Sequence, residues 1–86
     1  MRASLASSDA VKELVEYLAR RLVDDADAVR VETSIRDDAT VLMLHVAPDD
    51  RGKVIGRGGR IVRSLRTLVR ASGGRAGTRL VLEIAE

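Results

Sequence analysis

The chain of 86 residues is long enough for one small domain with a modest core. It has no cysteine and a single histidine, which excludes disulfides, thiolate metal sites and a cysteine nucleophile. The net charge of +2 hides an asymmetry: residues 1–50 hold 6 basic and 11 acidic side chains, and residues 51–86 hold 9 basic and 2 acidic. We therefore expect an anionic partner for the C-terminal part.

The N-terminal part of the chain, up to about Val23, predicts one helix. Met1 to Ser8 is expected to be a disordered start without the apolar stretch of a signal peptide, so the single domain is placed at residues 9–86. Ser7 or Ser8 can cap a helix that ends near Val23. Its apolar side follows helical spacing at Val11, Leu14, Val15, Leu18 and Leu22.

Two strands are predicted next. Alternating apolar and polar residues over Val29–Arg36 are typical of a half-buried strand. Asp37-Asp38 forms a tight turn, and Thr40–Ala47 is apolar on both faces, which places this second strand at the centre of a sheet.

The second half predicts helix, helix, strand. Pro48 ends the central strand, and Asp49 or Asp50 caps a short helix that reaches Val54 or Ile55. A longer helix is expected from Gly59 to Ala71, stopped by Ser72-Gly73-Gly74. Thr78–Ala85 completes an α+β domain with the order αββααβ.

The loop between the two predicted helices concentrates the chemistry. Gly56 and Gly59 can adopt backbone angles closed to other residues, so a sugar-phosphate backbone can lie against the turn. Arg57 and Arg60 can reach a phosphate at the positive end of the second helix, and Gly58 adds no bulk. The spacing fits neither the Walker nor the dinucleotide-binding motif, both of which also follow a strand rather than a helix.

At these residues the chain resembles a known family. Residues 54–61, read Val-Ile-Gly-Arg-Gly-Gly-Arg-Ile, are similar to the V-I-G-x-x-G-x-x-I signature of KH domains. The resemblance implies a type II KH domain, a three-stranded sheet packed on one face by three helices, that clamps about four single-stranded nucleotides. Together with Arg63, one helical turn further on, the predicted RNA-binding residues are Lys53, Val54, Ile55, Gly56, Arg57, Gly58, Gly59, Arg60, Ile61 and Arg63.

The resemblance extends to the small stand-alone bacterial KH proteins of the KhpA type. It implies an RNA chaperone or post-transcriptional regulator that self-associates or pairs with a larger KhpB-type KH protein. We expect a cytoplasmic protein without cofactor, metal site or membrane contact. The protein is also expected to be non-catalytic, because no nucleophile–base pair is present. A protein–protein adaptor, a ribosome-associated KH subunit and a single-stranded DNA binder remain as alternatives.

A row of arginines extends along the second predicted helix. Arg60, Arg63, Arg66 and Arg70 cover an arc of about 120°, separate from the apolar arc, so the row is expected to face solvent. We assign Arg66 and Arg70, which lie beyond the loop, to a solvated face or a helix-end charge preference, with an outer track for longer RNA as the alternative.

Overall fold

The computed structural model describes residues 6–86, leaving aside the side chains of residues 6, 7, 75 and 76. Residues 1–5 of the expected disordered start therefore lie outside the described residues. Ala6–Ala10 already form a wide helical turn that continues into the first α-helix. The helical turn thus contains Ser7 and Ser8, instead of beginning after them as predicted.

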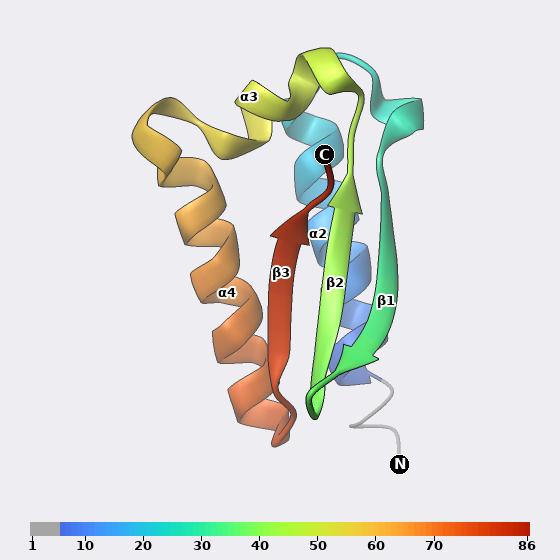
Figure 1. Ribbon diagram of the computed structural model, residues 1–86, viewed down its shortest axis with the longest axis vertical. Helices are drawn as coiled ribbons and strands as arrows, with labels where there is room; N and C mark the ends of the chain where they lie inside the picture. Colours follow the sequence, from blue (N-terminus) through green and yellow to red (C-terminus); the bar gives the residue numbers. More distant parts are fainter. Residues whose placement is uncertain (1–5) are drawn as a thin grey trace.

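The described chain forms a three-stranded sheet with helices packed on one face (Figure 1). The strand order is β1 (Arg30–Arg36), β2 (Ala39–His45), β3 (Leu80–Ile84), in which β1 and β2 are antiparallel and β2 and β3 are parallel. The central position predicted for the second strand is confirmed, as is the αββααβ order. The α-helices are α2 (Val11–Leu22), α3 (Arg51–Ile55) and α4 (Arg60–Ala76).

The β1–β2 hairpin closes through the predicted two-residue turn. Asp37 and Asp38 have φ angles of 52° and 66°, which is the geometry of a type I′ turn and one that aspartate tolerates. The half-buried character expected of the whole first strand is wrong for its second part. Val31 is buried and its amide donates to the carboxylate of Glu16 in the first α-helix, whereas Ile35 is 75% exposed.

One apolar core joins the sheet to all three helices. Each helix contributes small or branched side chains that meet the inward-facing residues of the three strands. Because α3 is short, Val54 is its main anchor in this core and has no exposed surface. The core residues are Val11, Val15, Ala19, Val29, Val31, Leu42, Leu44, Val54, Leu65, Val69, Leu80 and Leu82.

The last helix is longer than the sequence predicted. Instead of stopping at Ser72-Gly73-Gly74, α4 continues to Ala76 and ends at Gly77, whose φ is +76°. The amides of Gly77 and Thr78 donate to the carbonyls of Gly74 and Gly73, which is a Schellman ending. Gly73 serves close packing and does not end the helix. A Cβ at this position would lie 2.5 Å from the Thr78 carbonyl oxygen, so only glycine fits. Among residues 6–86, none of the helices is long and apolar enough to cross a membrane.

Candidate nucleic-acid interface

The glycine turn joins α3 to α4 as a helix–turn–helix. Gly56, Gly58 and Gly59 all have positive φ angles, of 80°, 66° and 76°. Gly56 is constrained twice, since a Cβ on it would also lie 2.7 Å from Cγ1 of Ile61. The side chain of Ile61 therefore packs against the bare α-carbon of Gly56, and this contact requires the glycine.

The turn leaves two backbone donors unpaired. The amide of Gly56 donates to the carbonyl of Gly52 at 2.9 Å, and the amide of Gly59 donates to that of Gly56 at 3.0 Å. No acceptor within residues 6–86 is recorded for the amides of Arg57 and Gly58. Both residues are exposed, so these two N–H groups and the Arg57 guanidinium are accessible to an anion.

Arg63 holds the turn from the first part of α4. Its Nη2 donates to the carbonyl of Gly58 at 3.0 Å, which fixes the exposed end of the turn to the helix. Arg60 lies at the first position of α4 and is exposed. The two arginines therefore differ: Arg63 positions the backbone of the turn, and Arg60 is a cation beside it.

Two side chains of the predicted RNA-binding set make their contacts away from the glycines. Val54 is fully buried, so its side chain is core and not groove floor. Lys53 turns away from the glycines, because its Nζ lies 3.2 Å from Oδ1 of Asp50 and 3.4 Å from Oδ2 of Asp24. The hydrogen bond from Lys53 to Asp50 raises the pKa of Lys53, and these two carboxylates offset its charge.

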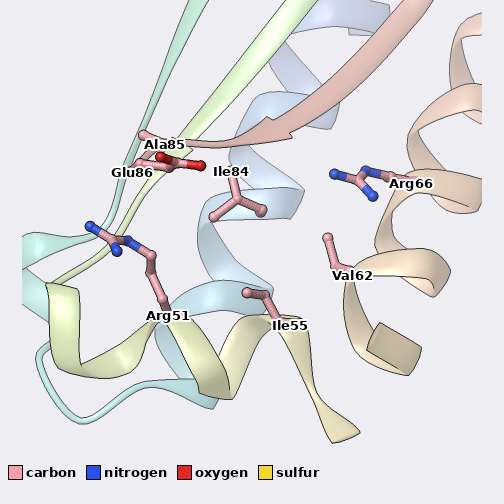
Figure 2. Close-up of a pocket in the computed structure, with 7 residues that line it drawn as sticks. All are labelled: Arg51, Ile55, Val62, Arg66, Ile84, Ala85 and Glu86. Carbon is pink, nitrogen blue, oxygen red and sulfur yellow. The ribbon is translucent and has the colours of Figure 1, made fainter. Parts of the chain in front are cut away.

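A groove of about 480 Å³ opens beside the turn, between α3, α4 and the end of β3. Ile55, Val62 and Ile84 point toward one another across it (Figure 2). Ile55 is 38% exposed. The apolar floor of the groove thus includes residues beyond those that flank the glycines. The lining residues are Arg51, Ile55, Val62, Arg66, Ile84, Ala85 and Glu86.

Most of these lining residues were not predicted. Arg66 is exposed, as expected, and it also lines the groove, where its Nε donates to the carbonyl of Leu82 at 3.3 Å. A helical-wheel signal could have found it, because Arg66 lies four residues after Val62 and shares its side of α4. The chain pattern gives no such signal for Arg51 or Glu86, which line the same groove although they lie in α3 and after the end of β3.

Asp50 fastens the start of α3 to the loop after α2. Its buried carboxylate accepts the amide of Asp25 at 3.0 Å and Nζ of Lys53 at 3.2 Å. The bond from the Asp25 amide, with smaller contributions from the Asp24 amide and Lys53, lowers the pKa of Asp50 against the opposing effect of burial. Asp50 was predicted as a cap, but its side chain makes no cap hydrogen bond.

We expect Asp50 to make folding dependent on acid pH. Since its pKa is lower in the folded state, its contribution is complete above about pH 4 and is lost as the pH falls through the folded-state pKa. Urea unfolding of the wild type and of Asp50→Asn, measured between pH 2 and 7, gives the free energy of unfolding at each pH. The two curves of this free energy against pH should converge in acid. Curves separated by a constant interval at every pH would contradict this role.

Comparison with known proteins places this geometry in a class. A Gly-x-x-Gly turn between two helices, within an αββααβ domain, is the arrangement of a KH domain. The family model described as "KhpA/KhpB, KH domain" matches residues 12–84. The chain belongs to this KhpA/KhpB family of KH domains.

Curated relatives agree over most of their length. A protein of Aquifex aeolicus is 51% identical over 78 residues, covering 90% of this chain and 98% of that protein. Relatives in Treponema pallidum and Mycobacterium tuberculosis are 48% and 50% identical, covering 87% and 79% of this chain and 94% and 85% of theirs. Each of the three is named "RNA-binding protein KhpA".

Proposed function

We propose that this protein binds single-stranded RNA without catalysis, by clamping the RNA backbone against the Gly56–Gly59 turn. The observation that carries the proposal is the exposed turn of left-handed glycines beside an apolar groove. The name of the relatives supports RNA as the ligand. The chain has one aromatic residue, so bases must lie on aliphatic side chains and not stack on aromatic rings.

The proposed clamp has two parts, the glycine turn for the phosphates and the groove for the bases. The amides of Arg57 and Gly58, the Arg57 guanidinium and Arg60 hold phosphates at the positive end of α4. Arg63 keeps the turn in shape through the carbonyl of Gly58.

The bases enter the groove. Ile55, Val62 and Ile84 form its floor, and Arg66 stands at its border. Ile61 supports the turn by packing against Gly56.

The small number of phosphate contacts limits affinity. About four contacts to a single strand give a log–log salt slope near −3, which is a loss of roughly fifty-fold between 50 and 200 mM salt. A second KH module therefore raises avidity, and we propose that it comes from a second copy or from a larger KhpB-type chain. In this form the protein acts as an RNA chaperone or post-transcriptional regulator in the cytoplasm.

Titration with randomised single-stranded oligonucleotides tests the function. We expect RNA to bind with a slope near −3 and to be displaced poorly by DNA of the same length. Equal competition by DNA would favour a general single-strand binder. No binding to either nucleic acid would favour the adaptor alternative and overturn the proposal.

A further inference from the structure

The outer side of α4 carries unneutralised positive charge well beyond the glycine turn. Arg60, Arg63 and Arg70 are exposed, and no carboxylate of residues 6–86 lies within ion-pair distance of their guanidinium groups. Three arginines on α2 and β1 are paired by contrast, since Arg20, Arg30 and Arg36 each lie near a glutamate at 3.9 Å, 3.2 Å and 3.1 Å. The sequence of α4 contains no acidic residue, so nothing on the helix offsets this charge.

These residues form one continuous surface. At about 100° per residue, Arg60, Arg63, Ser64, Thr67 and Arg70 fall within roughly 120° of the helix circumference, turned away from the groove side that carries Val62. The surface is hollowed, with a depression of about 550 Å³ lined by Arg60, Arg63, Ser64 and Thr67. We call the set Arg60, Arg63, Ser64, Thr67 and Arg70 the arginine face.

The arginine face extends past the reach of the clamp. Arg70 lies ten residues after Arg60, about 15 Å further along the helix axis. The groove and the turn lie near the N-terminal end of α4. Arg66 separates the groove from the arginine face, because its side chain bonds across to β3. A ligand at Arg70 is therefore not one of the nucleotides in the groove.

The chemistry of the face indicates phosphates and not bases. Its lining offers guanidinium groups and the Ser64 hydroxyl, and it contains no Val, Leu or Ile side chain and no aromatic ring. It is also continuous with the turn through Arg60, which belongs to both surfaces. An RNA strand that is held at the turn thus meets this face as it leaves the turn. Binding of an acidic protein would not require the face to be continuous with the turn.

We propose that the arginine face binds the phosphates of the RNA that flanks the four clamped nucleotides. The inference rests on the proposed function and extends the site from a four-nucleotide clamp to a longer backbone track. Roughly two further phosphates should steepen the salt slope by about 1.4. The protein then prefers long single strands to short ones for an electrostatic reason, apart from the larger number of binding registers.

Randomised RNAs of four and twelve nucleotides test this track. We expect the twelve-nucleotide RNA to bind with a slope about 1.4 steeper than the tetranucleotide. In Arg70→Glu, binding of the longer RNA should weaken about five-fold at low salt and lose about 0.7 of its slope, while tetranucleotide binding stays within two-fold. Lys12→Glu makes the same charge change beside β1, at the other edge of the sheet, and should affect neither RNA.

Amide and arginine Nε–H signals in NMR spectra separate the two surfaces. Both RNAs should shift the amides of Gly58 and Gly59, and only the longer RNA should shift Nε–H of Arg70. If the glycine signals move and Arg70 does not, or if Arg70→Glu and Lys12→Glu weaken binding equally, the track is wrong and the clamp stands. If the glycine signals remain fixed with both RNAs, the clamp itself is wrong, and the track that extends it falls too.

Discussion

Replacing Arg57 and Gly58 together by aspartate is expected to lower RNA affinity at least about 100-fold at low salt. The change removes the guanidinium at the turn and places two carboxylates beside the two amides that we propose to hold phosphates. Loss of a hydrogen bond to a charged group costs about 1.5–3 kcal/mol, and like-charge repulsion adds to this. Electrophoretic mobility or fluorescence anisotropy with labelled RNA measures the effect.

Folding should survive this double substitution. Both side chains are exposed, and no atom lies within 4 Å of a Cβ placed on Gly58. The left-handed backbone of Gly58 costs about 1 kcal/mol when aspartate occupies it. Gly58→Asn is the matched control, because it brings the same strain without the charge, and it should bind RNA within a few-fold of the wild type. If the double variant bound equally tightly with an unchanged salt slope, the turn would not be the binding site.

Two adjacent glycines in α4 should respond to alanine with opposite signs. Gly73→Ala is expected to lower the free energy of unfolding by about 2–3 kcal/mol, because the new methyl would lie 2.5 Å from the Thr78 carbonyl oxygen and 2.8 Å from Leu80. Gly74→Ala should raise it by about 0.5–1 kcal/mol, since no atom lies within 4 Å of its Cβ and alanine favours the helix.

Thermal unfolding followed by circular dichroism measures this pair. For a domain of this size, we expect Gly73→Ala to lower Tm by about 10 °C or more and Gly74→Ala to raise it by a few degrees. Since the two variants have the same composition, differences in charge or hydrophobicity cannot account for opposite shifts. Equal shifts would show that α4 does not approach β3 as closely at Gly73 as the structure has it.

The order of elements could be predicted because each signal was local. Alternation in the strands and the apolar spacing of α2 and α4 depend on neighbours within a turn or two. The end of α4 could not be predicted in this way. Gly73 and Gly74 look like a stop signal, but whether a glycine ends a helix or permits close packing depends on a distant partner, here Leu80 and the Thr78 carbonyl.

The site was predictable to the same extent. The glycine turn follows from spacing alone, and Arg57 and Arg60 follow from their place in it. The contacts of Lys53 and Arg66 were not predicted, because each has a tertiary partner, Asp24 and Asp50 in one case and the Leu82 carbonyl in the other. Those contacts cross from one element to another, and one sequence carries no record of which elements are neighbours.

The bond from Arg63 to the carbonyl of Gly58 bears on the lifetime of a complex. Together with the contact between Gly56 and Ile61, it gives the turn its shape before any ligand arrives. Binding then needs little rearrangement, so we expect association to be limited by diffusional encounter and charge steering. A weak complex that forms this fast must also dissociate fast. A single domain would therefore visit many transcripts briefly, and long residence on one of them would require a second domain on the same strand.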